Sequence, residues 1–330
     1  MVICIGDIHA SDNRPWSYNV SKEVVDYIIH SPHNNSGNSL VLLGDLTESA
    51  FLSGQIYELL LKLFSGLKYS KVYILVGNHD KKANKQGKLV LSYKFLQGDL
   101  ARELFPNTRI EVVSTRTVAT IEGIDCLLLP YVFSDSGHGF ETYEEISDDK
   151  HYGVIFGHFT DTSDMAIKDR TVDISHLKSD YVCLGHQHNP GNNYIGSVVP
   201  NSTSEQNKNR SIWCFSKDTQ GVYLTKEPIP NICDYHTVTF PENLPKVEAQ
   251  YPIWTVLECA SEDIAKEQYG DIFVLKCIYK AVMDIQGLQD MGVFGSKEAF
   301  TNEKLFAMFK EGAKYDDPSI LQVAESYMTG

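Results

Sequence analysis

Five short motifs within the first 190 residues combine carboxylate, amide and imidazole side chains. In chain order they are Asp7-Ile8-His9, Gly44-Asp45, Gly77-Asn78-His79-Asp80, Gly157-His158 and Gly185-His186-Gln187-His188. In an Asp-x-His or His-x-His pair, an extended backbone places both side chains on one side, so both can face the same ion. These donors suit Mn, Fe or Zn, and the absence of cysteine from the motifs argues against a structural zinc site.

The number of donors predicts two ions. A pair of divalent ions ~3.5–4 Å apart needs roughly seven or eight protein ligands when water or substrate completes each shell. The motifs offer seven: Asp7, His9, Asp45, Asn78, His158, His186 and His188. Asp45 is the natural bridge, because one carboxylate can span both ions. We expect Mn²⁺ in the site, with Fe²⁺ or Zn²⁺ as alternatives. Separate capping or solvated residues are the competing interpretation, but each motif follows an apolar run.

The elements that must position these motifs are short apolar strands alternating with helices, which predicts an α/β fold. In open α/β sheets, ligands lie outside the carboxyl ends of the strands. Helices are expected at Lys22–Ile29, Gln55–Phe64 and Tyr93–Leu104. The expected strands are Val2–Ile5, Leu40–Leu43, Val72–Val76, Ile110–Val113, Cys126–Pro130, Gly153–Phe156 and Tyr181–Leu184.

A change in the sequence pattern divides the chain into two predicted domains, 1–235 and 236–330. Prolines cluster before the boundary, and a small β-α-β unit follows it at Ile253–Cys259, Ser261–Gln268 and Ile272–Tyr279. The second domain carries 15 acidic residues against 8 lysines and no arginine, a net charge of −7. Because DNA binds basic surfaces, this net negative charge argues against a second domain that binds DNA by itself.

Composition narrows the setting of the protein. Seven dispersed cysteines without a Cys-x-x-Cys pair indicate reduced thiols. No apolar run reaches the ~20 residues that a membrane span needs, and the N-terminal Met1–Ile5 lacks the basic segment of a signal peptide. We therefore expect no membrane association and a cytoplasmic location. The net charge of −14 gives no overall attraction for polyanions.

The order of the five motifs resembles the signature of the calcineurin-like metallophosphoesterases, over residues 1 to about 215. The resemblance implies a sandwich of two mixed sheets flanked by helices, followed here by a small α+β cap. It also implies hydrolysis of phosphoesters by metal-assisted attack of water. His79 would lie beside the scissile phosphate, with Asp80 orienting it. One ion would be held by Asp7, His9, Asp45 and His188, and the other by Asp45, Asn78, His158 and His186.

Within that family, the sequence is most similar to DNA nuclease subunits of the Mre11/SbcD type, in their compact phage-encoded form. The similar segments are 180–188 and the run Tyr194-Ile195-Gly196-Ser197 … Glu205 … Ile212-Trp213-Cys214-Phe215. A small domain after the core is also where those nucleases carry a DNA-capping domain. The second motif departs from their pattern, because Thr47 replaces an aromatic residue. This leaves Asp45 intact and affects only local packing or substrate shape.

Further residues are candidates for contacts with DNA. Lys81, Lys82, Lys85 and Lys88 follow the third motif and could bind a phosphate backbone, although a solvated loop explains them equally well. Tyr131 and Phe133 could stack on a base, or simply pack in the core.

The resemblance implies a Rad50/SbcC-type ATPase as partner, and a homodimer is possible. The apolar faces of Asn302–Lys314 and Ile320–Met328 are candidate partner-binding helices, or they pack against their own core. The leading hypothesis is a Mn²⁺-dependent nuclease for recombination, repair or end processing, with exonuclease action on duplex ends and endonuclease action on single strands. Two alternatives are a phosphoesterase acting on small nucleotides or phosphoproteins, and a non-catalytic scaffold subunit.

Overall fold

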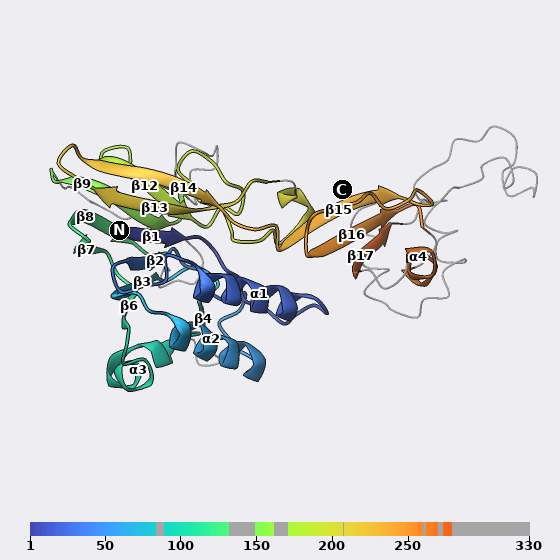
Figure 1. Ribbon diagram of the computed structural model, residues 1–330, viewed down its shortest axis with the longest axis horizontal. Coiled ribbons are helices and arrows are strands. Elements are labelled where there is room, and N and C mark those ends of the chain that lie inside the picture. The colour runs from blue at the N-terminus through green and yellow to red at the C-terminus, as the bar shows by residue number, and fades with distance from the viewer. Residues whose placement is uncertain are drawn as a thin grey trace, which may run out of the picture. The chain divides into compact units, whose positions relative to one another are not determined.

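A six-stranded mixed sheet forms the centre of the protein (Figure 1). The structure, a computed structural model, describes residues 1–83, 89–131, 149–161, 171–206, 208–259, 262–269 and 273–278. The sheet order is β14 (Val222–Pro228), β13 (Ser211–Lys217), β1 (Val2–Ile5), β2 (Ser39–Leu42), β3 (Lys71–Leu75) and β6 (Arg109–Val113). Strands β1, β2, β3 and β6 run parallel, and β13 pairs with β1 in the antiparallel direction.

A second mixed sheet packs on one face of the first. Its order is β12 (Lys178–Gly185), β9 (His151–His158), β8 (Ile124–Leu129) and β7 (Thr117–Ile121). Alternate residues of a strand point to opposite faces. Val2 and Cys4 of β1 therefore lie in the core between the sheets, whereas Ile3 and Ile5 lie in the core under the helices. Burial on both faces explains why β1 has no polar residue.

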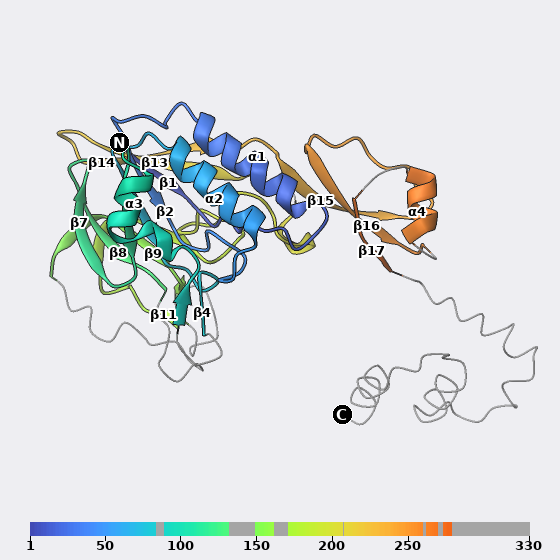
Figure 2. The ribbon, with the colours of Figure 1, turned by 90° about the horizontal axis from the view of Figure 1, so that it is seen from below.

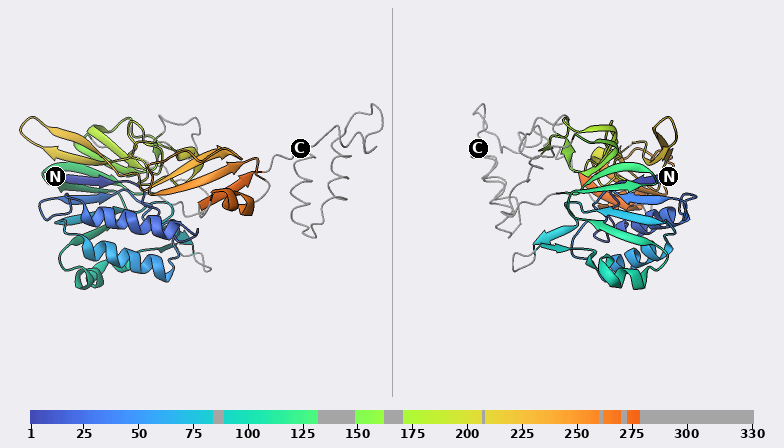
Figure 3. Two further views of the ribbon diagram at one scale, coloured as in Figure 1. Left: turned by 45° about the vertical axis from the view of Figure 1, so that its right-hand side comes forward. Right: turned by 90° about the vertical axis from the view of Figure 1, so that its left-hand side faces the viewer.

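Two helices cover the outer face of the six-stranded sheet, α1 (Ser17–His30) and α2 (Gly54–Gly66). Figures 2 and 3 show them lying side by side on that face. Ser53 caps α2, because its side chain accepts a hydrogen bond from the Ile56 amide at 3.2 Å. The two-sheet sandwich flanked by helices confirms the expected fold class.

The seven predicted strands are all present, but the helix predicted over Tyr93–Leu104 is interrupted. The structure has a short 3₁₀ helix, η1 (Lys94–Leu96), and a separate helix α3 (Gly98–Leu104). Gln97 between them is extended, and Gly98 has a φ of +75°, which L side chains rarely adopt. This backbone cannot continue a single helix.

A three-stranded parallel sheet follows, made of β15 (Cys233–Thr239), β16 (Tyr251–Leu257) and β17 (Phe273–Ile278), with helix α4 (Glu262–Tyr269). The predicted β-α-β unit corresponds to β16, α4 and β17. Strand β15 runs across the boundary predicted at residue 235, and contacts group Met1–Tyr279 as one unit and Lys280–Gly330 as another. The division at 235 stays a prediction, and the predicted helices at 302–314 and 320–328 lie outside the described residues.

Short elements complete the fold: the hairpin of β4 (Lys81–Ala83) and β5 (Leu89–Leu91), the pair β10 (Thr160–Asp161) and β11 (Thr171–Val172), and the 3₁₀ turn η4 (Thr203–Glu205). Within the described residues, every helix is too short or too polar to cross a bilayer.

Candidate metal centre

All seven predicted ligands come together where strands of both sheets end. Asp7 and His9 follow β1, Asp45 follows β2 and Asn78 follows β3 in the six-stranded sheet. His158 ends β9, and His186 and His188 follow β12 in the second sheet. Parallel strands that end at the same edge deliver these side chains to one place.

The first group of donor atoms belongs to Asp7, His9 and His188. The Nε2 atoms of the two histidines are 2.9 Å apart. Asp7 Oδ2 lies 4.0 Å from Nε2 of His9 and 3.8 Å from Nε2 of His188.

The second group belongs to Asp45, His158 and His186, together with Asn78. Asn78 Oδ1 lies 3.0 Å from His158 Nε2 and 2.8 Å from His186 Nδ1. Asp45 Oδ2 is 3.3 Å from His158 Nε2 and 3.7 Å from His9 Nε2. That one oxygen lies between both groups, which is the place of a bridging carboxylate.

The spacing of these atoms fits divalent ions. Donors that each lie about 2.0–2.2 Å from one ion are themselves separated by about 3 Å. The separations of 2.8–3.3 Å within Asn78, His158, His186 and Asp45 match that value. Carboxylate, amide oxygen and imidazole donors in two groups that share Asp45 are therefore suited to two ions.

Contacts on the far side of three imidazole rings fix the atom that each ring presents. Nδ1 of His9 lies 2.8 Å from a Glu48 carboxylate oxygen, and Nδ1 of His188 lies 3.1 Å from Glu205 Oε1. His158 donates from Nδ1 to the Leu43 carbonyl at 2.6 Å. With a proton on each Nδ1, the Nε2 atoms would offer their lone pairs to a metal, as in ligating histidines generally.

The electrostatics of the centre, in the absence of metal, favour cations. Burial opposes protonation of His9, but the hydrogen bond to Glu48 and the charges of Asp45 and Asp7 outweigh it and raise the His9 pKa to about 8. Burial likewise opposes protonation of His158, but the charge of Asp45 outweighs it and raises the pKa to about 9. For His186, burial and the His158 charge lower the pKa to about 3. The buried carboxylates thus keep the His9 and His158 rings protonated, and bound metal ions would supply that positive charge instead.

Glycine precedes five of the seven ligands, because a side chain at any of these positions would collide with a neighbouring atom. A Cβ on Gly77 would lie 2.1 Å from Asp45 Oδ1, and one on Gly44 would lie 2.5 Å from His158 Nδ1. Gly44 also has a φ of +101°. Asp45, His9 and His186 are non-glycine residues with positive φ, and such strain gathers at functional sites.

His79 lies beside the ligands, whereas Asp80 is buried beneath them. His79 donates from Nδ1 to the Glu48 carbonyl at 3.0 Å, and its ring meets the His9 ring edge-on at 5.0 Å between centroids. Asp80 accepts hydrogen bonds from the Gly77 amide at 2.8 Å and the Tyr93 hydroxyl at 2.9 Å. Burial and the Asp45 charge raise the Asp80 pKa to about 6. These contacts fit a residue that fixes the loop carrying His79, and the catalytic roles of both residues stay predictions.

Of the other residues predicted to contact DNA, only some lie in the part of the chain that the structure describes. Lys81 is half-buried and Lys82 is exposed, both on β4, while Lys85, Lys88 and Phe133 lie outside the described residues. The Tyr131 ring lies 6.0 Å from the His186 ring and 6.3 Å from the His158 ring, between centroids. Tyr131 therefore borders the metal centre.

Sequence reasoning missed the residues that hold the ligands from behind. Arg210 is buried and donates from Nη1 to the His188 carbonyl at 3.0 Å and to Ser197 Oγ at 2.8 Å. Its Nη2 donates to the Glu205 carbonyl at 3.0 Å. Glu205 accepts from the Asn201 amide with the carboxylate that also bonds His188. The Gly-Ser … Glu run pointed to this region, but nothing in the sequence singled out Arg210 or Glu48.

One more group of potential donors lies apart from the centre. His33, Cys214 and Glu227 offer atoms within 4.8 Å of one another, and His33 Nε2 lies 2.8 Å from a Glu227 oxygen. That short contact is a hydrogen bond between the segment after α1 and strand β14, and it accounts for the grouping.

Comparisons with known proteins identify one family. Among solved structures, a protein of unknown function from Aquifex aeolicus is similar over 40% of this chain and 61% of its own chain, with 14% identity and a TM-score of 0.25, which carries no argument about function. No curated protein matches. The model of the calcineurin-like phosphoesterase family matches residues 1–190. Because that match spans more than half of the chain, the protein belongs to the calcineurin-like phosphoesterases, whose members use two divalent metals to hydrolyse phosphoesters.

Proposed function

We propose that this phosphoesterase is a Mn²⁺-dependent phosphodiesterase that cleaves DNA, as a nuclease subunit of the Mre11/SbcD type acting in recombination, repair or end processing. The observation that carries the hydrolytic part is the convergence of seven ligand side chains with His79 beside them. The nuclease part is supported by the run that follows the fifth motif. In the structure this run supplies Ser197, Glu205 and Arg210, which hold His188 in place.

The chain's own residues have separate tasks in the reaction. Two bound divalent ions would lower the pKa of an attacking water and neutralise charge on the phosphoryl oxygens. Asp45 would hold both ions at a fixed separation, and the Nδ1 contacts of His9, His158 and His188 keep the ligand rings oriented. His79, with Nδ1 bound to the Glu48 carbonyl, directs Nε2 to the substrate side, where it stabilises the transition state or protonates the leaving oxygen.

We also propose a Rad50/SbcC-type ATPase as the partner of this subunit. The C-terminal part of the chain is acidic, with 15 acidic residues against 8 lysines from His236 onward. Such an acidic composition suits a basic protein partner better than DNA. The net charge of −14 also favours a second candidate function, hydrolysis of a small nucleotide ester, because a small substrate needs no basic surface.

One experiment separates these functions. The purified protein is incubated with Mn²⁺ and each of three substrates: linear duplex DNA, bis-p-nitrophenyl phosphate and a 2′,3′-cyclic nucleotide. The matched variant is Asp45→Ala, which removes the carboxylate shared by both donor groups and should abolish every metal-dependent activity. We expect DNA degradation that requires Mn²⁺ and disappears in this variant.

The opposite result is equally clear. If the small esters are hydrolysed and DNA stays intact at low salt, with and without the ATPase subunit, then the protein acts on small substrates. If Asp45→Ala retains full activity, the hydrolysis comes from a contaminant or from another site.

A further inference from the structure

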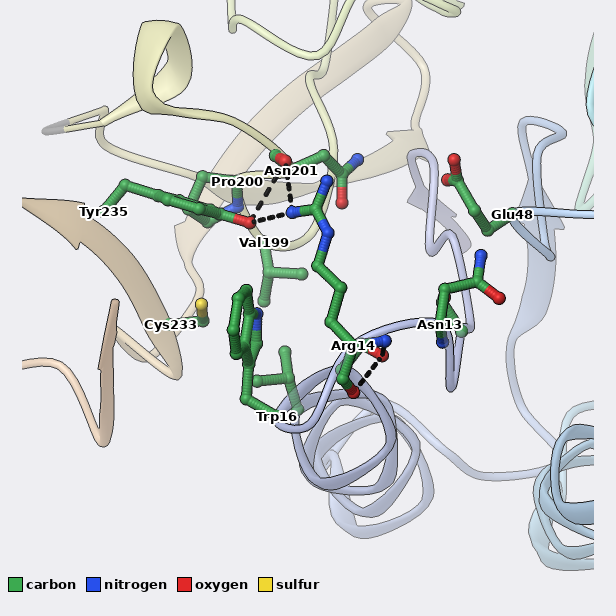
Figure 4. A pocket seen from close by; sticks show the side chains of 12 residues that line it. Asn13, Arg14, Trp16, Glu48, Val199, Pro200, Asn201, Cys233 and Tyr235 are labelled. Carbon is green, nitrogen blue, oxygen red and sulfur yellow. Dashed lines mark hydrogen bonds between the residues drawn. The ribbon is translucent and has the colours of Figure 1, made fainter. Parts of the chain in front are cut away.

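A cavity of about 210 Å³ is lined by 12 residues, none of which is among the predicted metal ligands (Figure 4). Its floor is formed by the start of α1, and its walls by the segments that follow β1 and β2, the segment before η4, and β15. The polar residues that line it include Ser11, Asn13, Arg14, Glu48 and Asn201.

Two of the lining residues also hold metal ligands from behind. Glu48 is in contact with His9 Nδ1 through its carboxylate and with His79 through its carbonyl. Asn201 donates its amide to Glu205, and its side-chain nitrogen lies 3.4 Å from His188 Nδ1. Glu48 and Asn201 therefore belong both to the lining of the cavity and to the residues that contact the ligand rings of the metal centre.

The cationic group of the cavity is held in a fixed position. Nη1 of Arg14 donates to the Tyr235 hydroxyl at 3.0 Å and to the Asn201 carbonyl at 3.5 Å. The guanidinium carbon also lies 5.8 Å from the centre of the Trp16 ring. Figure 4 shows the guanidinium between Tyr235 and Asn201 at the inner end of an extended side chain. Among the described residues, the side-chain hydrogen bonds of Arg14 involve Nη1, so Nη2 and Nε can donate to a ligand.

The charge of the cavity suits an anion in spite of Glu48. The Glu48 carboxylate is engaged with His9, whose Nδ1 lies 2.8 Å from it. Arg14 is the cation among the lining residues, and Asn13, Asn201 and two serines add neutral hydrogen-bonding groups. A guanidinium fork with amide and hydroxyl neighbours is well suited to a phosphate diester.

We propose that this cavity binds a second phosphate of the substrate, the one next to the scissile phosphate on a nucleic-acid strand, through the guanidinium of Arg14. The proposal rests on the proposed nuclease function and adds a basis for selection. A strand offers two neighbouring phosphates to the metal centre and to Arg14, whereas an isolated ester offers one. Arg14 is then a specificity-determining residue that favours oligonucleotides over small esters.

The experiment compares substrates that differ in the second phosphate alone. These are bis-p-nitrophenyl phosphate, a trinucleotide with two phosphodiesters, and the same trinucleotide with an uncharged methylphosphonate at the bond that is not cleaved. The variants are Arg14→Ala and, as a matched control, Arg102→Ala, an exposed arginine on α3. Values of kcat/KM are measured with Mn²⁺.

We expect Arg14→Ala to lower kcat/KM for the trinucleotide by about tenfold or more, as for loss of a charged hydrogen bond. The methylphosphonate should lower the wild-type value by a similar factor and leave the Arg14→Ala value unchanged. Arg102→Ala should behave as the wild type. The proposal is overturned if Arg14→Ala lowers kcat/KM equally for all three substrates, or if the wild type ignores the methylphosphonate.

A structural role for Arg14 is tested separately. Tyr235→Phe keeps the guanidinium and removes one of its tethers, so it should lose less on the trinucleotide than Arg14→Ala. An equal loss in both variants, with the methylphosphonate effect intact in each, would make Arg14 only a tether. If the wild type hydrolyses none of these substrates, the proposed function fails. Binding of a labelled oligonucleotide, followed by fluorescence anisotropy, then decides whether Arg14 contacts the second phosphate.

Discussion

The Nε2 atoms of His9 and His188 lie 2.9 Å apart although 179 residues separate them in the chain. Each ring is held from behind by a carboxylate, Glu48 in one case and Glu205 in the other. The two halves of the sandwich therefore present matching donors, each with its own support. The metal centre thus depends on the donor side chains, on the residues that hold the donor rings, and on the glycines that let the donors come close together.

His79→Ala should separate catalysis from metal binding. The ring contacts the Glu48 carbonyl and lies beside His9, so its loss leaves the seven ligands in place. We expect two bound ions by elemental analysis, retained DNA binding, and a fall in kcat of roughly 10²–10⁴-fold. Unchanged hydrolysis would remove His79 from the reaction.

Asp80→Asn should act on stability more than His79→Ala does. The Asp80 carboxylate is buried and accepts hydrogen bonds from Gly77, Thr47 and Tyr93. The NH₂ group of an asparagine would face at least one of these three donors, so that hydrogen bond would be lost. A lost hydrogen bond to a charged group costs about 1.5–3 kcal/mol. Denaturant titration of the two variants makes the comparison. Equal stabilities, with catalysis lost only in Asp80→Asn, would show that Asp80 acts in the chemistry instead.

Gly77→Ala should disrupt the centre without changing any ligand. Its Cβ would lie 2.1 Å from Asp45 Oδ1 and 2.3 Å from the Asp45 amide, so the bridging carboxylate must move. Such overpacking costs about 1–3 kcal/mol. Gly54→Ala is the matched control, since no atom lies within 4 Å of its added Cβ. Metal content and melting temperature should fall in the first variant only; two ions in Gly77→Ala would contradict this account.

Glu205→Gln should weaken metal binding while leaving the reaction possible. The glutamine loses the charge that orients His188 and supports its basicity. Removing such a support typically costs 10–100-fold in metal affinity. A Mn²⁺ titration of activity should shift to higher concentration, and excess Mn²⁺ should restore most of kcat. Glu227→Gln, which changes a carboxylate paired with His33, should leave the titration unmoved.

The buried thiols should be unreactive in the folded protein. Six of the seven cysteines are buried, and burial raises the pKa of Cys126, Cys214 and Cys233 to about 12. The reactive thiolate is therefore scarce at pH 8. A disulfide reagent should modify at most one thiol rapidly, that of Cys277, whose side chain is outside the described residues. Denatured protein should give seven. Rapid labelling of a Cys126 peptide would show that the sandwich opens.

Sequence patterns predicted the ligands and the strands because both depend on local rules. A buried strand such as β1 needs apolar residues on both faces, and a ligand must follow directly where the strand ends. The sequence pattern included Glu205 but did not predict that Glu205 and Arg210 contact His188, because they lie 17 and 22 positions from it in the chain. The break at Gly98 was visible as a glycine, but its positive φ was not.

The pairing of β1 with β13 has a consequence for the order in which the protein forms during synthesis. Residues 2–4 of β1 pair with residues 213–215 of β13. One edge of β1 therefore stays unpaired until β13 has emerged from the ribosome. Such pairing between distant segments is slow, because a long loop must close before any contact forms. A nascent chain that has passed His188 holds every ligand, yet its first strand still lacks a neighbour on one side. Complete assembly of the sheet that carries the centre therefore waits until residue 215 has emerged, and chains released before that point should be prone to aggregation.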